Sequence, residues 1–474
     1  MSESGSKRSA ARSALTGALP FVAGVAVFFA LPDSLDSPAR WALAITAGTL
    51  AAWVLEAVPL TATAIPIIFV LAASGAVSPD AAVSGFGSSA TLLLIAGFMM
   101  AAALERTPLA RRLTYHFLLR SPLNSSGVLA GLLAALIVLA VFVPSTVVRA
   151  VALLPVVVTL AEAFIRYGSP NGAKRLLLGL AFGATLGGIA FLPSAVVNVL
   201  AVDLIAGAGG ERITYFGWFA LAWPVEVLAF IALWTGLVLL FPTPQEQTLD
   251  RSAVAGRLEE LGPMTREEKR LAGILVFTAL LWCAESVTGW HPSVPAFLAV
   301  ALMTISPAKV VPWEDVLDIP WGSVFLFGAS LSLAFALRDT GGAEWLGERL
   351  LGTGAVEVAR FGAVAGILVV AAIMLVYQLA FAGSTPAAAT LLPVLISGAA
   401  VLELPVEAVG MTVALAGLAT FVLPSQAMSN LVTYETGLYT AGDLRRVGIL
   451  LTFVFLAILG AVAAMWWNPI GFLA

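Results

Sequence analysis

Long apolar runs, separated by short polar stretches, occupy almost the whole of this 474-residue chain. A helix needs roughly 20 apolar residues to cross the hydrocarbon core of a bilayer, so such runs predict membrane spans. Several of the runs are too short to cross alone, and these predict helices that are broken within the membrane. The pattern predicts an all-α polytopic membrane protein, with helices near 15–31, 40–56, 60–76, 90–104, 126–143, 148–166, 176–192, 196–208, 217–241, 271–287, 293–306, 321–338, 358–382, 387–400, 406–423, 427–438 and 446–467.

Two of the apolar runs carry a polar break near their middle. One reads "FVPSTVVRAVALLPVV" at residues 142–157, and the other reads "FAGSTPAAATLLPVL" at residues 381–395. In both, residues that interrupt a helix, Pro and Gly, stand beside hydroxyl side chains. We interpret both breaks as re-entrant helical hairpins that turn inside the membrane, with tips at 144–148 and 383–386.

The chain repeats itself after about half its length. Five short matches recur in the same order, 229 to 238 residues apart. Each match is weak alone, but their common order favours an internal duplication. The matches are "WVLE" at 53–56 with "WCAE" at 282–285, "ALERT" at 103–107 with "ALRDT" at 336–340, "LLPV" at 153–156 and 391–394, "LPS" at 192–194 and 423–425, and Asn198 with Asn430.

Charged residues predict the orientation of the two halves. Lys7, Arg8 and Arg12 precede the first apolar run, and basic residues in short loops favour the cytoplasm. With that orientation Glu56 and Glu285 end their spans on opposite faces, so we expect two inverted repeats. We divide the chain into a cytoplasmic N-terminus with the first transmembrane helix (1–38), repeat one (39–241), a polar cytoplasmic linker (242–269) and repeat two (270–474).

Composition narrows the class of protein. The chain is 60% hydrophobic and 11% charged, and its mean hydropathy is +0.99, whereas soluble domains carry about 25% charged residues. One cysteine and two histidines argue against a thiolate or histidine metal centre. The sequence has no zinc motif, paired catalytic carboxylates or Ser–His arrangement, so we expect neither an enzyme nor a nucleic-acid-binding protein. The predicted location is the inner or plasma membrane, spanned several times.

The polar breaks are the candidate binding chemistry. Broken helices expose unpaired N–H and C=O groups, and in inverted-repeat transporters the site lies where helices break, near the midplane. The first pair of breaks is the hairpin tips, where Pro144-Ser145-Thr146 matches Gly383-Ser384-Thr385. The second pair is "GGIAFLPSAVVN" at 187–198 and "GLATFVLPSQAMSN" at 417–430. The competing interpretation is hydroxyls that bond to their own helix, or ordinary caps.

We predict substrate contacts at both pairs of breaks and an ion, Na⁺ in particular, held by many of the same oxygens. No other cofactor is expected. The predicted substrate-binding residues are Ser145, Thr146, Arg149, Asn198, Gly383, Ser384, Thr385 and Asn430. The predicted ion-binding residues are Ser145, Thr146, Ser194, Asn198, Ser384, Thr385, Ser425 and Asn430.

Arg149 is the most informative charge, because an arginine at membrane depth is expensive and usually faces a cavity or a partner. It could contact an anionic substrate bidentately. It could instead hold a positive charge where a related protein binds a cation. A third interpretation is that the hairpin tip is shallow and Arg149 lies in an aqueous vestibule.

At these residues the chain resembles the divalent anion/sodium symporter family, over nearly its whole length. The similarity is carried by "WVLEAVPLTATAIPI" at 53–67, "GFMMAAALERTPLARRL" at 97–113, "LGPMTREEKRLAGILVFTALLWCAE" at 261–285 and "IPWGSVFLFGASLSLAFALRDTGGAEWLG" at 319–347. The resemblance implies a homodimer that moves substrate between two hairpin tips by an elevator mechanism. In the family each tip carries Ser-Asn-Thr. Here the tips read Ser145-Thr146-Val147 and Gly383-Ser384-Thr385, and the run from Pro144 to Arg149 resembles exchanger-like members.

The sequence therefore predicts a secondary transporter of small divalent anions. C4-dicarboxylates are the first expectation, driven by sodium coupling or by anion exchange, with a small anion, the lipid bilayer and a second copy of the chain as partners. An alternative is another anion on the same scaffold, such as sulfate, citrate, an aromatic acid or an oxyanion. An alternative from a different class is an ion channel.

Overall fold

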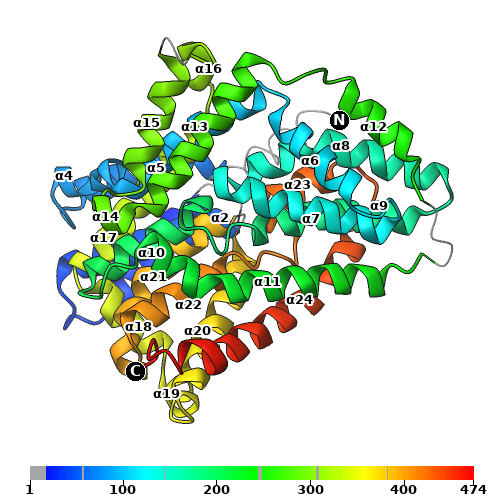
Figure 1. Ribbon diagram of the computed structural model, residues 1–474. Helices are drawn as coiled ribbons and strands as arrows, with labels where there is room; N and C mark the ends of the chain where they lie inside the picture. Colours follow the sequence, from blue (N-terminus) through cyan, green and yellow to red (C-terminus); the bar gives the residue numbers. More distant parts are fainter. Residues whose placement is uncertain (1–17, 56–57, 144, 244–247, 306–308, 382) are drawn as a thin grey trace, which may run out of the picture.

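The computed structural model describes residues 18–55, 58–143, 145–243, 248–305, 309–381 and 383–474. Within these ranges all regular elements are helical, which confirms the predicted fold class of an all-helical polytopic membrane protein with broken helices (Figure 1). Three of the sequence features lie outside the described residues: Pro144, Glu56 and the basic residues before residue 18.

The first half of the chain ends in a long helix that precedes the linker. It begins with the helix Ala18–Ala30. Short 3₁₀ turns join several of the helices, including η1 (Leu60–Thr63), η2 (Ser84–Gly87) and η3 (Leu192–Ser194). The helices are α2 (Ser37–Val54), α3 (Ala64–Ala73), α4 (Pro79–Ala82), α5 (Ser89–Glu105), α6 (Leu109–Arg120), α7 (Ser125–Phe142), α8 (Thr146–Arg166), α9 (Pro170–Leu186), α10 (Val196–Gly207) and α11 (Tyr215–Leu240).

The linker contains one helix, α12 (Arg251–Glu259), and the second half follows it. The 3₁₀ turns here are η4 (Gln378–Ala380), η5 (Ala399–Leu402) and η6 (Pro424–Gln426), and a π-helical turn, Ala463–Trp467, follows the last helix. The helices are α13 (Arg266–Cys283), α14 (Glu285–Thr288), α15 (Ser293–Thr304), α16 (Trp313–Val316), α17 (Trp321–Asp339), α18 (Gly342–Leu350), α19 (Thr353–Ala359), α20 (Ala363–Tyr377), α21 (Ser384–Ser397), α22 (Val406–Gly417), α23 (Met428–Tyr434) and α24 (Ala441–Val462).

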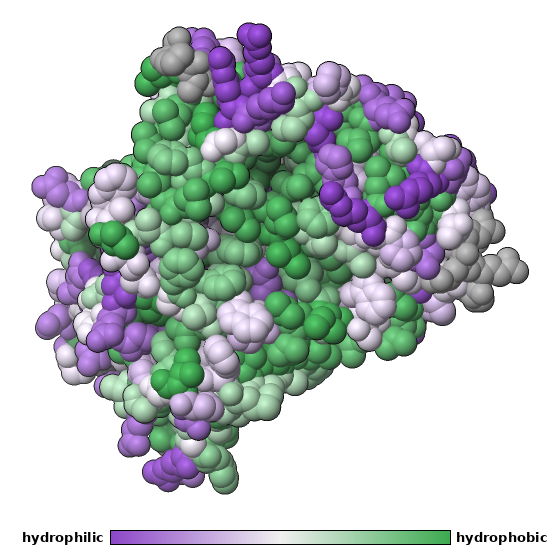
Figure 2. All heavy atoms as spheres, in the orientation of Figure 1, coloured by the Kyte–Doolittle hydropathy of each residue, from purple (hydrophilic) through white to green (hydrophobic). Residues whose placement is uncertain are grey.

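Six helices of the described chain are long and apolar enough to cross a membrane, and α5 with α6, bent by 71°, would make a seventh span. The other apolar helices have 10–17 residues, which agrees with the prediction that several segments are too short to cross alone. On the face shown in Figure 2, hydrophobic residues cover the centre and hydrophilic residues gather along the upper and left edges. The six helices are α7, α8, α11, α17, Ala363–Ala380 and Ala441–Trp467.

Several predicted spans end earlier or start later than expected, and glycine explains two of these differences. The span near 176–192 stops at Leu186, where Gly187 and Gly188 follow. The span near 358–382 is split at Gly362, whose φ of 117° lies in a region that favours glycine. The chain therefore turns between α19 and α20, and only the second of them is long enough to span the membrane.

The two halves interlock through the elements that carry the polar breaks. Helix α9 packs against its own hairpin arm α8 and also against α23 of the other half. Helix α22 packs in the same way against α21 and against α10. Across this junction the Thr185 and Ser429 hydroxyls are 3.1 Å apart, and the rings of Phe182 and Phe421 meet edge to face with centroids 5.4 Å apart. Helices α11 and α24 lie side by side along one flank (Figure 1).

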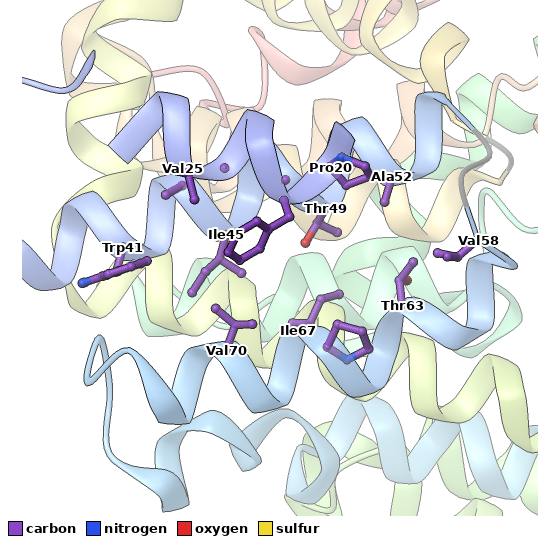
Figure 3. Close-up of a pocket in the computed structure, with 15 residues that line it drawn as sticks. Pro20, Val25, Trp41, Ile45, Thr49, Ala52, Val58, Thr63, Ile67 and Val70 are labelled. Atoms are coloured by element: carbon purple, nitrogen blue, oxygen red, sulfur yellow. The ribbon is translucent and has the colours of Figure 1, made fainter. Parts of the chain in front are cut away.

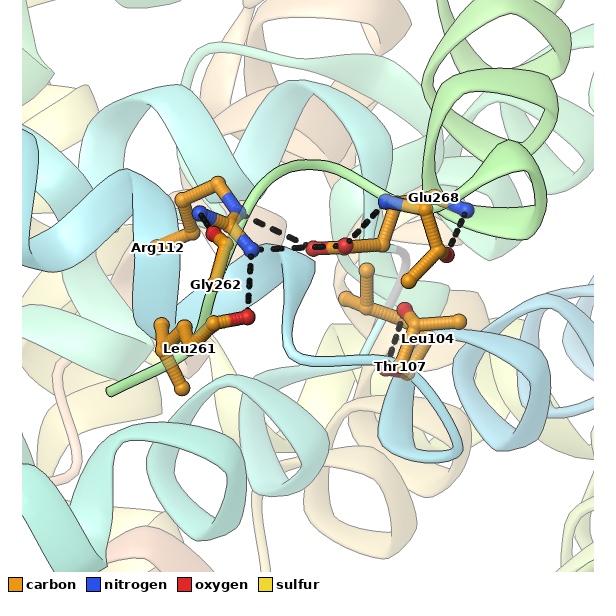
Figure 4. A network of polar contacts seen from close by, with 7 residues as sticks. Leu104, Thr107, Arg112, Leu261, Gly262 and Glu268 are labelled. Atoms are coloured by element: carbon orange, nitrogen blue, oxygen red, sulfur yellow. Dashed lines mark hydrogen bonds and ion pairs between the residues drawn. The ribbon is translucent and has the colours of Figure 1, made fainter. Parts of the chain in front are cut away.

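A buried ion pair joins the linker to the first half (Figure 4). Arg112 of α6 donates from Nε to Glu268 Oε1 over 3.0 Å, and from its two terminal nitrogens to the carbonyls of Gly262 and Leu261. Glu268 is fully buried and also accepts from the Thr265 N–H at 2.9 Å, as part of a capping box that begins α13. One guanidinium therefore fixes both the end of the linker and the start of the second half.

We expect Arg112→Ala to destabilise the purified protein, because it leaves the Glu268 carboxylate buried without its partner. Breaking a buried pair of this kind costs about 3–5 kcal/mol. The matched control is Arg257→Ala, whose ion pair with Glu260 is exposed at both ends and contributes about 0–1 kcal/mol. Thermal unfolding in detergent measures the difference, and equal unfolding temperatures for the two variants would refute a clamping role.

Candidate functional site

The two broken helices have the same local geometry. Asn198 Nδ2 donates to the carbonyl of Gly188 over 2.7 Å and to that of Phe191 over 3.3 Å. Asn430 Nδ2 donates to Thr420 over 2.7 Å and to Leu423 over 3.3 Å. Both asparagines are fully buried, and both Oδ1 atoms lack a hydrogen-bond partner among the described residues. Each amide therefore bridges the break in its own helix and keeps one oxygen free.

The structure shifts the register that the sequence matches suggested at this break. The turn η3 ends at Ser194 and η6 ends at Gln426, and the residues after them, Ala195 and Ala427, share the same extended conformation. Ser194 therefore corresponds to Gln426, whereas the "LPS" match had paired it with Ser425. Ser425 is exposed whereas Ser194 is buried, so the two serines of the "LPS" match do not occupy equivalent positions. A match of three residues is too short to fix a register to one position.

The first hairpin tip begins helix α8. Ser145 caps the helix, and its hydroxyl accepts from the Val148 N–H at 3.4 Å, a long contact. Ser145 is buried and Thr146, the first residue of the helix, is half-buried. The capping interpretation that we had weighed for this hydroxyl therefore holds for Ser145.

The second hairpin tip begins helix α21 and has no side-chain cap, because its capping residue is Gly383 with φ 127°. The cap positions pair Ser145 with Gly383, which places Thr146 opposite Ser384, one residue away from the match first expected. Ser384 and Thr385 lie half-buried in the first turn of the helix. Neither hydroxyl makes a hydrogen bond within the described chain.

Three of the four helices that begin at these breaks start without a side-chain cap. The capping positions are Gly383 for α21, Ala195 for α10 and Ala427 for α23. The first N–H groups of such helices have no intrahelical acceptor. Together with the helix dipole, they favour a negative charge placed beyond the helix start.

Arg149 is directed toward helix ends rather than toward solvent. Its guanidinium donates to Ala184 O from Nε (3.2 Å) and Nη2 (2.8 Å), and from Nη1 to Val143 O (2.6 Å) and Ser194 O (3.1 Å). Its side chain is fully buried, which argues against the aqueous vestibule. These carbonyls end α7, α9 and η3, the negative ends of three helical segments. This set of oxygens would suit a cation, which fits the second interpretation of Arg149.

In the second half of the chain, oxygen atoms without hydrogen-bond partners among the described residues correspond to the region that Arg149 occupies in the first half. Gln378 Nε2 donates to Ala416, the counterpart of Ala184, and to Ala419. Gln378 Oε1 and Thr420 Oγ1, like Asn430 Oδ1, are buried and unpartnered within the described residues. Gln378 and Thr420 are not among the residues predicted from the sequence. Their signal was available, because the duplication aligns them with Ala140 and Gly188, so both are polar in one half only.

One cavity has a lining that differs in kind from the tips. About 250 Å³ of space lies in an open hollow between the helix Ala18–Ala30, α2 and α3 (Figure 3). The labelled side chains of Trp41, Ile45, Ile67 and Val70 surround it, and none of the described residues that line it is charged. Because such a wall offers no countercharge to a small anion, we place the candidate anion site at the hairpin tips and helix breaks.

Broken helices that bring free N–H groups and unpartnered oxygens into the core of a membrane protein define a class, the secondary transporters with discontinuous helices. A family model described as the sodium:sulfate symporter transmembrane region matches residues 12–473. The chain therefore belongs to this family of secondary, sodium-coupled anion transporters and is not an enzyme. This confirms the family resemblance expected from the sequence.

Individual relatives agree with this family. A Cupriavidus necator protein described as a membrane protein is 27% identical over 96% of this chain and 93% of its own. The sodium-dependent dicarboxylate transporter SdcS of Staphylococcus saprophyticus is 24% identical over 92% of this chain and 87% of its own. The crystal structure of the Alcanivorax borkumensis YdaH transporter covers 82% of this chain and 87% of its own, with a TM-score of 0.53 and 15% identity. That last likeness shows the fold alone.

We expect Gly383→Ala to impair the second tip, because a residue with a Cβ is strained at φ 127°, at a cost of about 1–3 kcal/mol. Space is not the cause, since an added Cβ would meet only Pro386 Cδ at an ordinary 3.5 Å. Gly256→Ala in α12 is the control, with an ordinary helical conformation and nothing within 4 Å. Anion uptake into proteoliposomes should fall for Gly383→Ala and stay unchanged for Gly256→Ala. Full uptake by Gly383→Ala would show that the tip tolerates another conformation.

Proposed function

We propose that this protein transports small divalent anions and that C4-dicarboxylates are its preferred substrates. The observation that carries the proposal is the group of helix starts at the breaks, three of them without a side-chain cap. Their N–H groups and dipoles provide positive potential for an anion without a fixed countercharge. The hydroxyls of Thr146, Ser384 and Thr385 lie in the first turns of α8 and α21 and supply further donors. Two such tips suit a ligand with a carboxylate at each end.

The transport cycle in this proposal is an elevator movement within a homodimer. The cross-packing of α9 with α23 and of α22 with α10 supports it, because hairpins and broken helices from both halves then form one body that could move as a unit. The orientation that goes with it is a cytoplasmic N-terminus and a cytoplasmic linker. The two halves would be inverted repeats, so that the tips approach the site from opposite faces of the membrane.

Sodium coupling in this proposal comes from half two alone. In half one the Arg149 guanidinium binds the carbonyls that end three helical segments, where a coupling cation would otherwise bind. In half two the neutral residues Gln378, Thr420 and Asn430 keep buried oxygens without partners among the described residues. Carbonyl, amide and hydroxyl oxygens at an unwound helix suit Na⁺.

Sulfate is the second candidate substrate, because the matching family model names it. Sulfate presents its two charges within one compact ion, whereas a C4-dicarboxylate separates them. Reconstituted protein should take up labelled succinate, and excess unlabelled succinate should compete better than sulfate. The opposite order of competition would replace dicarboxylate with sulfate as the substrate.

We expect Ser384→Ala and Thr385→Ala each to weaken succinate binding by about 2- to 10-fold, the value of one hydrogen bond of 0.5–1.5 kcal/mol. The control is Ser397→Ala, at the opposite end of the same helix α21. The half-saturating succinate concentration for uptake is the measurement. Unchanged values for both tip variants would remove the second tip from the site.

We expect Thr420→Val to raise the sodium concentration needed for half-maximal uptake by about 3- to 10-fold, since it replaces one candidate oxygen ligand with a methyl group. Thr412→Val is the matched control, because Thr412 is equally buried but its hydroxyl already donates to Ala408 O at 2.7 Å. Uptake is measured over a series of sodium concentrations at constant ionic strength. An equal shift in both variants would point to packing instead of ion binding.

A further inference from the structure

Two oppositely charged side chains bind the segment that connects α9 to α10. We call this segment, residues 184–194, the α9–α10 connection. Arg149 binds both ends of the α9–α10 connection, at Ala184 O and Ser194 O. Glu226 of α11 binds its middle, where Oε2 accepts from the Ala190 N–H at 2.5 Å. Both side chains are buried, with Glu226 3% exposed, and they bind the same short stretch of backbone, at Ala184, Ala190 and Ser194.

Glu226 is an unusual residue for its position. It lies within a 26-residue helix that is apolar enough to span the membrane, two residues after Pro224. A carboxylate at such depth is costly unless it is paired, and one N–H group does not balance a full charge. The positive charge of Arg149 has the same problem, because its hydrogen-bond partners among the described residues are all neutral carbonyls. Each charge therefore needs the other.

The second half lacks both charges together. Helix α21, which corresponds to α8, contains no charged residue, and α24, which corresponds to α11, contains none after Arg446. There the N–H groups of Val422 and Leu423 are bound by a neutral oxygen, Gln426 Oε1, both at 2.8 Å. The first half therefore contains both charged side chains, Arg149 and Glu226, and the second half contains no charged side chain at either corresponding helix position.

We propose that Glu226 is the fixed countercharge of Arg149. Together the two side chains position the α9–α10 connection, and because their charges cancel, this part of the first half needs no ion from solution. Glu226 is a positioning residue in this inference, since it acts through Ala190 and Arg149. This inference rests on the proposed function and adds to it how the charge of Arg149 is balanced. The experiments that test it use no substrate, so its failure can be told apart from a wrong substrate.

The first test separates charge from hydrogen bonding. Glu226→Gln keeps an oxygen for the Ala190 N–H but removes the charge, and the control Glu285→Gln does the same for a carboxylate that accepts from the Tyr215 N–H at 2.6 Å. Arg212, the ion-pair partner of Glu285, is 39% exposed, so water can replace that carboxylate. We expect Glu226→Gln to unfold about tenfold faster at a fixed temperature, by tryptophan fluorescence, and Glu285→Gln to stay within about threefold of the parent protein. Equal rates in the two variants would overturn the proposal.

The second test removes the partner. Arg149→Met removes the guanidinium from the carbonyls of Val143, Ala184 and Ser194 and leaves the Glu226 carboxylate in place. The double variant Arg149→Met, Glu226→Gln removes both charges. We expect the double variant to unfold at least about tenfold more slowly than the two single effects combined predict. Sodium chloride, compared with choline chloride, should stabilise Arg149→Met further and lose that extra effect in the double variant. Additive effects of the two single substitutions would overturn the pairing, and so would the same sodium response in Arg149→Met and in the double variant. If Arg149→Met does not fold, the comparison of Glu226→Gln with Glu285→Gln decides.

Discussion

The structure depends on satisfying backbone groups where helices break inside an apolar protein. An unpaired N–H or C=O group that is buried away from water costs free energy comparable to a lost hydrogen bond. At the breaks that follow α9 and α22 the chain provides an asparagine amide that bridges the gap, Asn198 in one half and Asn430 in the other. The breaks can therefore persist as fixed features of the fold, with some N–H groups and oxygens left over for a ligand.

The two halves solve this shared problem with different chemistry. Half one uses full charges, Arg149 on the carbonyls and Glu226 on an N–H group. Half two uses neutral groups, Gln378 and Gln426, and keeps unpartnered oxygens within the described residues. In a protein built from two similar halves, the same backbone problem is therefore solved once with charged side chains and once with neutral ones.

Sequence reasoning succeeded where the signal was local or repeated. The apolar runs predicted the helices, and the paired matches around Ser145, Gly383, Asn198 and Asn430 lie where helices α8, α21, α10 and α23 begin. It failed by one residue at Ser425 and at the tip residues Ser384 and Thr385, because backbone geometry sets the register there. It also passed over Gln378 and Thr420, because a single polar residue in an apolar helix is more often a self-satisfied hydroxyl or amide.

The sequence by itself determined that this is a helical membrane protein of two related halves with polar breaks, because hydropathy, Gly and Pro placement and internal repetition are properties of the chain alone. Only the tertiary structure decided what Arg149 contacts. An arginine can face a substrate, a cavity or a carbonyl, and the choice depends on where Val143, Ala184 and Ser194 end their segments relative to α8. Those ends are up to 45 residues away in sequence and meet only when the hairpin packs against the broken helix.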